Sequence, residues 1–223
     1  MTKLVFLVDI DNTLLDNDRV KAAMEAGIRG LAGDDGARDF WEIYEEVRRE
    51  LDYVDLPVTL ARFRARRPDL RRFAQMSALL LNYPFEKDLY PEAMAVVAHL
   101  RTMGTVVVLS DGDPVFQPAK IGRIGVADAV DSNVLIYAHK ERHLNEVRDL
   151  YPADHYVLID DKSGVLARAK TVLGDGLTAV HVHQGKYATH DEPGVEPGPD
   201  IELDGIADVL KLSAEDFGGD PGA

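Results

Sequence analysis

The chain has 223 residues, no cysteine and a formal net charge of -14 at pH 7. Its length and its 46% hydrophobic content suffice for a buried core, so we expect one folded domain with room for a sizeable insertion. The charge argues against nucleic acid or an anionic membrane as a partner, and the lack of cysteine excludes disulfides and zinc–thiolate sites. No apolar run approaches the roughly 20 residues that span a bilayer, and the N-terminus has no secretory signal pattern, so we expect a cytoplasmic protein.

The first predicted element is a buried strand at residues 4–8, an apolar run with β-branched members. It ends in the sequence DIDNT, which contains Asp9, Asp11 and Thr13. Ligands of open α/β sheets bind beyond the carboxyl ends of the strands, so two acids at this point are candidates for a functional site. Ordinary turn chemistry is the alternative, because Asp and Asn are frequent where strands end.

A long segment without strand-like alternation follows, from about residue 16 to residue 83. Apolar residues recur there at helical spacing, and Pro57 and Pro68 divide the segment into about four helices. For Trp41 and Tyr44, packing in the core is the preferred interpretation, and stacking on a base or sugar is the alternative.

Six arginines make this helical segment locally basic in an acidic protein. A solvated helix face is the preferred interpretation, and contact with an anionic part of a substrate is the alternative. The cluster consists of Arg62, Arg64, Arg66, Arg67, Arg71 and Arg72.

Strands and helices alternate from Pro91 onward. The patterns predict strands at 105–109, 133–136, 156–159 and 178–182, and helices at 91–103, after Pro114, at 140–150, 164–173 and 206–212. This alternation predicts an α/β fold with a parallel sheet and helices on both faces, and the all-helical segment should form a separate lid. We expect a loop at 190–200 and a frayed end over the last seven residues.

The strand at 105–109 leads into a second polar segment, Ser110-Asp111-Gly112-Asp113. Asp113 before Pro114 is an ordinary helix start, so it needs no functional explanation. Ser110 is not needed for that cap, and its hydroxyl, together with the backbone amides of the turn, can hold a phosphate oxygen.

Two further positions carry charge where an element starts or ends. Lys140 lies at a predicted helix start, where a cation is unfavourable, although a solvated side chain is the usual role of a single lysine. Asp160 and Asp161 directly follow the strand at 156–159. Adjacent carboxylates are costly unless a cation lies beside them, and a hard divalent cation is the simplest remedy.

Together these segments resemble the haloacid dehalogenase (HAD) superfamily of phosphatases and phosphotransferases. Its four motifs match, in order, Asp9-x-Asp11-x-Thr13, Ser110, Lys140 and the pair Asp160–Asp161. The resemblance covers the chain outside the helical segment. It implies a Rossmann-like HAD core at 1–15 and 88–223, and a helical C1 cap at 16–87 that closes over the site and selects the substrate.

The resemblance also implies a chemistry, a magnesium-dependent phosphatase that acts on a small phosphomonoester through an aspartyl-phosphate. Asp9 would be the nucleophile, and Asp11 would protonate the leaving oxygen and then activate water. Ser110 and Lys140 would hold the transferred group, with Asp111 and Gly112 in the same phosphate-binding turn. The expected Mg²⁺ ligands are Asp9, the backbone carbonyl of Asp11, Asp160 and Asp161.

Asp11 also separates reactions within this family. The dehalogenases lack an acid at that position and expel halide without a protonated leaving group, so Asp11 favours phosphate-ester hydrolysis. A sugar phosphomutase is one alternative, and a binding or regulatory module with little turnover is another. The sequence does not rank substrates or predict the oligomeric state.

Three residues depart from the family pattern. Glu141 stands where many relatives carry Pro, and Asp111 places an additional acid beside the expected phosphate site. Lys120 is a rival for the third motif, but its spacing fits worse, and an exposed helix lysine would explain it.

Two histidine pairs are weaker candidates. His139 and His143 have the spacing of a zinc pair without an evident third ligand. His181 and His183 share one face of the last predicted strand, where packing or a position at the rim is expected.

Overall fold

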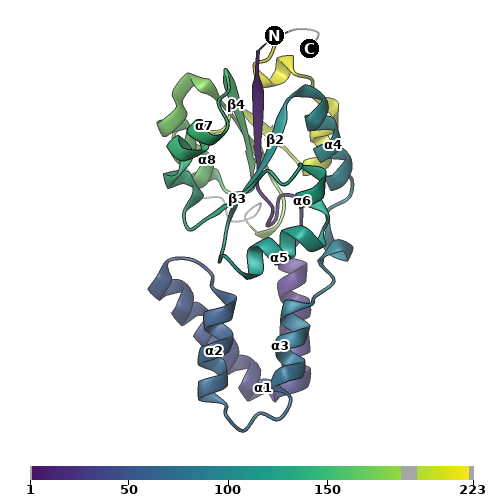
Figure 1. The fold of residues 1–223 in the computed structure, drawn as a ribbon, viewed down its shortest axis with the longest axis vertical. Helices are drawn as coiled ribbons and strands as arrows, with labels where there is room; N and C mark the ends of the chain where they lie inside the picture. Colours follow the sequence, from purple (N-terminus) through teal and green to yellow (C-terminus); the bar gives the residue numbers. More distant parts are fainter. Residues whose placement is uncertain (1, 187–194, 221–223) are drawn as a thin grey trace.

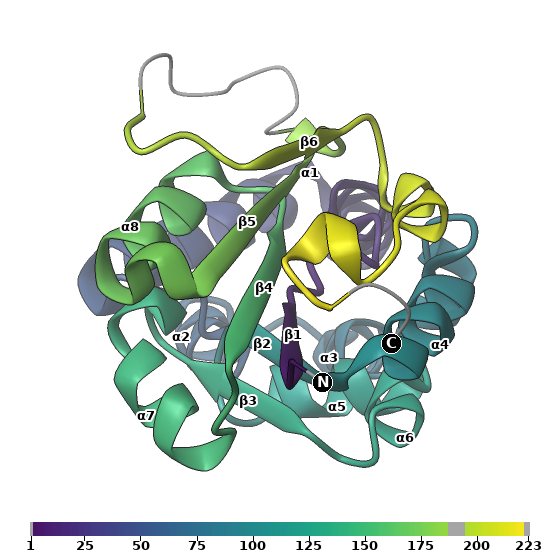
Figure 2. The same cartoon turned by 90° about the horizontal axis from the view of Figure 1, so that it is seen from above.

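The computed structural model describes residues 2–186 and 195–220. Its centre is a six-stranded, all-parallel sheet in the order β3-β2-β1-β4-β5-β6 (Figures 1 and 2). The strands are β1 (Leu4–Val8), β2 (Thr105–Asp111), β3 (Val134–Tyr137), β4 (His155–Asp160), β5 (Leu177–Val182) and β6 (Ile201–Leu203). The predicted α/β fold is therefore confirmed.

Helices cover both faces of this sheet (Figure 2). One face packs against α7 and α8, and the other packs against α4, α5, α6 and the C-terminal 3-10 turns. The bounds are α4 (Ala93–Met103), α5 (Phe116–Arg123), α6 (Val126–Ala129), α7 (Leu144–Leu150) and α8 (Ser163–Leu173). The apolar strand residues are buried on both faces, as expected for a sheet covered twice.

Three further helices lie together beyond the carboxyl end of the strands (Figure 1). They are α1 (Asn17–Leu51), α2 (Leu56–Arg66) and α3 (Phe73–Leu81). Gly33 interrupts α1 with φ 73°, a conformation that suits glycine, so α1 consists of two segments. With α2 and α3 this makes the four helical segments that the sequence predicted, and Pro57 lies in the first turn of α2.

The end of the chain differs from the prediction. Phe217, expected in a frayed tail, is fully buried and packs edge-on against Phe6 of β1, with ring centroids 5.3 Å apart. The helix expected at 206–212 is a 3-10 turn, Ile206–Lys211, and the three-residue strand β6 was not predicted. The loop expected at 190–200 lies partly outside the described residues.

Strand register brings the polar strand ends to one edge of the sheet. Val8 lies opposite Val108 on β2 and Ile159 on β4. One residue further along, Asp9 and Asp160 therefore emerge side by side at the carboxyl edge, next to the helical layer. Within the described residues, no helix has the length and apolar character that crossing a membrane requires.

Candidate active site

The loop after β1 is held by its own backbone and by one asparagine. The Asp9 amide donates to the Ile159 carbonyl at 3.0 Å, which continues the pairing with β4 beyond the strand. Asn12 adopts the left-handed conformation, with φ 62°, and its Oδ1 accepts the Asn17 amide at the start of α1 at 3.0 Å. The DIDNT segment is thereby tied to both the sheet and the helical layer.

Lys140 is the cation at the centre of the site. Its Nζ lies 2.5 Å from Asp9 Oδ1 and 2.6 Å from Asp160 Oδ2, and it donates to the Leu109 carbonyl at 3.2 Å. The side chain is fully buried. Burial opposes its charge, but Asp160 and Asp9 outweigh burial and raise the pKa of Lys140. Lys140 is thus a charged partner of the carboxylates. A solvated side chain, the usual role of a single lysine, does not describe it.

Three buried carboxylates lie together at this point, and Lys140 contacts two of them. Oxygen atoms of Asp9, Asp160 and Asp161 lie within 4.8 Å of one another. Both side-chain oxygens of Asp161 are buried and have no hydrogen-bond partner. Burial, followed by the charges of Asp160 and Asp9, raises the pKa of Asp161 to about 9. An all-oxygen set with two orphaned buried oxygens fits a hard divalent cation such as Mg²⁺.

Asp11 lies apart from this cluster, although it is only two residues from Asp9. Lys120 Nζ contacts both of its carboxylate oxygens, at 2.5 and 2.7 Å, and Gln117 Nε2 donates to Oδ2 at 3.2 Å. Burial alone would raise the pKa of Asp11, but Lys120 and Gln117 outweigh burial and lower it. The expectation that Lys120 is an exposed helix lysine is wrong, because its side chain is 3% exposed.

The turn after β2 connects these groups. Gln117 Nε2 also donates to Ser110 Oγ at 2.9 Å, and a Cβ on Gly112 would lie 2.8 Å from Gln117 Cβ. Asp111 Oδ1 accepts the backbone amide of Lys140 at 2.8 Å, and its other oxygen lies 3.7 Å from Lys162 Nζ. The acid that departs from the family pattern therefore anchors the turn that carries Lys140.

A cavity of about 230 Å³ separates the helical layer from the strand ends. Asp11, Gly112 and Lys120 line it on the sheet side, and Trp41 and Tyr44 of α1 line it on the helical side. Tyr44 is buried as predicted, yet both aromatic residues also face this space.

Two contacts join the helical layer to the sheet beside the cavity. His139 Nε2 lies 3.0 Å from Asp52 Oδ2 at the end of α1, and the Leu56 amide donates to Asp113 Oδ2 at 3.4 Å. His143 instead stacks on the Tyr137 ring, with centroids 4.2 Å apart. In the described ranges, the one group of three potential metal ligands is the aspartate cluster, so the zinc interpretation of the two histidines gains no support.

The second histidine pair lies near the aspartate cluster. The His181 and His183 rings are 4.3 Å apart, and His181 Nε2 lies 3.1 Å from the Asp161 carbonyl oxygen. His181 is buried, in line with the expected packing role.

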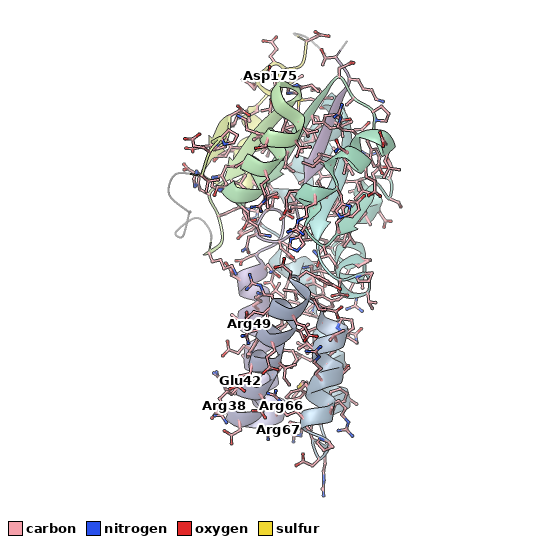
Figure 3. All side chains as sticks on the ribbon, turned by 90° about the vertical axis from the view of Figure 1, so that its left-hand side faces the viewer. Arg38, Glu42, Arg49, Arg66, Arg67 and Asp175 are labelled. Carbon is pink, nitrogen blue, oxygen red and sulfur yellow. The ribbon has the colours of Figure 1, made fainter. Side chains whose placement is uncertain are left out.

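Three arginines of the cluster, Arg62, Arg66 and Arg67, form ion pairs with acids of α1. Arg62 contacts Glu50 at 2.6 Å, and Arg67 contacts Asp39 at 2.5 Å. In Figure 3, Arg66 and Arg67 lie at the end of the helical layer that is farthest from the sheet. None of the six arginines is among the described residues that line the cavity. These contacts favour the surface interpretation over a substrate contact.

Sequence reasoning missed Gln117 and Lys162, and it considered Lys120 only as a rival for the third motif with an exposed side chain. Two of these residues, Lys120 and Gln117, contact Asp11, which is more than 100 residues away in the sequence. The third, Lys162, lies near Asp111 at the end of another strand. The one available signal was the position of Lys120 and Gln117 in the helix that follows the second strand, which the Ser110 motif already placed near the site.

Comparison with solved structures shows what the chain is similar to. A haloacid dehalogenase-like hydrolase from Burkholderia xenovorans is 42% identical, with a TM-score of 0.87, and the match covers 96% of this chain and 100% of that one. The L-2-haloacid dehalogenase from Xanthobacter autotrophicus is 19% identical over 95% of this chain and 98% of that one (TM-score 0.61). A HAD-hydrolase from Bacillus subtilis, described as bound to magnesium, is 13% identical over 95% and 98% (TM-score 0.63).

The last two similarities concern the fold alone. No family model and no curated protein matches the chain. The first similarity extends over essentially the whole of both chains. The chain belongs to the haloacid dehalogenase-like hydrolases.

Proposed function

We propose that the protein is a magnesium-dependent phosphatase that acts on a small phosphomonoester. The observation that carries this proposal is the pair of orphaned, buried Asp161 oxygens beside Asp9 and Asp160. Lys140 offers one positive charge to three carboxylates, so a divalent cation is the natural complement of the cluster. Mg²⁺ held by Asp9, Asp160 and Asp161 would neutralise charge on the phosphoryl oxygens.

The residues support a two-step reaction. In the first step, Asp9 Oδ attacks phosphorus, the ester P–O bond breaks, and the leaving oxygen takes a proton from Asp11. In the second step, Asp11 takes a proton from water, the water oxygen attacks phosphorus, and the bond between phosphorus and Asp9 breaks. Lys140 contacts Asp9, and the Ser110 hydroxyl shares Gln117 as a hydrogen-bond donor with Asp11, so both residues are candidates for holding the transferred phosphoryl group.

Asp11 favours ester hydrolysis over dehalogenation. A departing halide needs no proton, whereas an alkoxide leaving group does. Lys120 and Gln117 hold the Asp11 carboxylate away from the aspartate cluster, at the cavity where a leaving group would lie. A carboxyl group at this position can serve phosphate-ester cleavage, as the acid when it is protonated and as the base when it is ionised, whereas a departing halide needs no proton.

The helical layer would act as the cap of this site. The proposed cap spans residues 16–87, and its aromatic residues face the cavity above Asp11. Closure over the cavity would exclude water while the leaving group departs.

The test measures two reactions of the purified protein. Phosphate release is followed across a panel of phosphomonoesters with and without Mg²⁺, and chloride release is followed from chloropropionic acid. Asp9→Asn is the control, because the amide keeps the shape of the side chain but removes the nucleophile. We expect Mg²⁺-dependent phosphate release that falls at least about 10³-fold in Asp9→Asn.

Two outcomes would contradict the proposal. Chloride release without phosphate release would identify a dehalogenase. Release of neither phosphate nor chloride by folded, magnesium-loaded protein would favour a binding module with this fold.

A further inference from the structure

The cavity beside Asp11 has a distinct chemistry on its helical wall. Both segments of α1 contribute to that wall, Lys21 from the first and Trp41 and Tyr44 from the second. The Trp41 and Tyr44 rings meet edge to face, with centroids 5.0 Å apart. These rings supply apolar surface to the cavity that Asp11, the group that would protonate a leaving oxygen, also lines.

Three polar groups of this wall, on Lys21, Trp41 and Tyr44, are donors without an acceptor among the described residues. Trp41 Nε1 is buried and has no hydrogen-bond partner, and the Tyr44 hydroxyl forms no hydrogen bond within the described ranges. Lys21 Nζ lies 5.1 Å from the centroid of the Tyr44 ring and forms no ion pair with a described carboxylate. A buried N–H without an acceptor costs free energy, so this wall is suited to an acceptor that a ligand brings.

The acids around the cavity are already engaged. Asp11 is paired with Lys120, and Asp52 with His139. Asp111 lies near Lys162, and Asp113 accepts the Val115 and Phe116 amides. Unlike the lining cations Arg48, Lys120 and Lys162, Lys21 forms no ion pair with a carboxylate of the described residues, and a ligand anion would complement it.

The volume limits the size of the ligand. A cavity of about 150 Å³ holds one benzene ring, so about 230 Å³ accommodates one ring with small substituents. We propose that the substrate is a phosphomonoester whose leaving group is a single flat ring with a second anionic group, bound against Trp41 and Tyr44 with its anion at Lys21. This inference rests on the proposed phosphatase function and names the substrate class of the same site.

The test uses three probes that differ in one group: phenyl phosphate, para-carboxyphenyl phosphate and the neutral isostere para-carbamoylphenyl phosphate. Binding is measured with Mg²⁺ in the Asp9→Asn protein, which holds the esters without turning them over. Trp41 is the only tryptophan of the chain, so its fluorescence reports occupancy of this cavity directly. Calorimetry of the same titrations gives an independent Kd.

Lys21→Met, built on Asp9→Asn, removes the proposed anion partner. Its matched control is Lys87→Met, because Lys87 also lies over a tyrosine ring, 4.5 Å from the Tyr83 centroid, but does not line the cavity. We expect the carboxylate probe to bind about tenfold or more tighter than its carbamoyl isostere. Lys21→Met should abolish this preference while phenyl phosphate binding stays the same, and Lys87→Met should preserve both.

The outcomes separate the two proposals. Equal affinity for the carboxylate and carbamoyl probes, unchanged by Lys21→Met, would overturn the substrate class while leaving the phosphatase proposal intact. Tight carboxylate binding that survives Lys21→Met would overturn the role of Lys21. Absence of binding for all three esters, together with no phosphate release by the unaltered protein, would overturn the phosphatase proposal and this inference with it.

Discussion

Asp9 and Asp11 are two residues apart, and their environments push their pKa values in opposite directions. Burial dominates at Asp9 and raises its pKa to about 6, although Lys140 opposes the rise. At Asp11, Lys120 and Gln117 outweigh burial, and the pKa falls. Separate cations thus give the two neighbouring carboxyl groups different proton affinities in the metal-free protein, and Asp11 is the more acidic of the two.

Lys120 tunes Asp11, and Lys120→Met should expose this role. Without the cation, the pKa of Asp11 should rise, because an adjacent positive charge stabilises the ionised carboxylate. We expect the limb of the pH profile of kcat/KM that Asp11 controls to move to higher pH by about 1–3 units. Lys120→Arg should move it less. A pH profile that stays in place in folded Lys120→Met protein would show that Lys120 has only a structural role.

The site residues that the sequence predicted share one property: each lies at the carboxyl end of a strand, directly after a strand, or at the start of the next element. Asp9, Ser110 and Asp160 are found by locating the ends of apolar runs, and the parallel sheet then brings those ends to one edge. Lys120 and Trp41 lie inside helices, where spacing shows only that a residue is helical. What they face depends on packing between distant segments, which no local pattern encodes.

A strand or helix could be predicted from the sequence where its burial requires a recognisable pattern of apolar residues. β2 and β4 are long apolar runs, and their positions agree with the predictions to within two residues. β6, with the sequence IEL, is too short to show a pattern, and it forms because it pairs with the edge of β5. The prediction for Phe217 was wrong because its burial also depends on a distant segment: its partner Phe6 lies near the other end of the chain.

The junction between α4 and β2 depends on one close approach. A Cβ at Gly104 would lie 2.4 Å from the Leu4 carbonyl oxygen of β1, and backbone cannot move aside as a side chain can. We expect Gly104→Ala to force β1 and β2 apart and to lower the free energy of unfolding by about 1–3 kcal/mol, measured by urea denaturation.

Gly122→Ala is the matched control for that change. Gly122 lies in α5, and a Cβ there would meet no atom within 4 Å. Alanine should therefore stabilise this helix by about 0.5–1 kcal/mol. Equal effects of the two substitutions would disprove the steric explanation for Gly104.

The whole molecule should respond to pH through the aspartate cluster. The pKa of Asp161 rises from 3.8 in an exposed reference to about 9 in the folded protein. Between these values the folded chain retains a proton that the unfolded chain has lost. The stability of the metal-free protein should therefore fall as pH rises from about 4 to about 9.

Magnesium should reverse this loss, because it replaces the proton among the carboxylates. At a concentration about a hundred times Kd, we expect Mg²⁺ to raise Tm by roughly 5–10 °C, and by more at about pH 8 than at about pH 5. Thermal unfolding with and without EDTA measures the effect, and Asp161→Asn should remove most of it. A magnesium shift that is independent of pH would argue against the cluster as the binding site.

The central place of β1 has a consequence for biosynthesis. β1 is the first strand to leave the ribosome, yet its neighbours β2 and β4 begin at Thr105 and His155. The helical layer is made before either neighbour, so the chain carries an unpaired apolar strand through most of its translation. A nascent chain that stops before His155 contains Asp9 but not the strand that brings Asp160 beside it. Folding of the sheet must therefore wait for contacts far apart in sequence, which makes it slow compared with the helical layer.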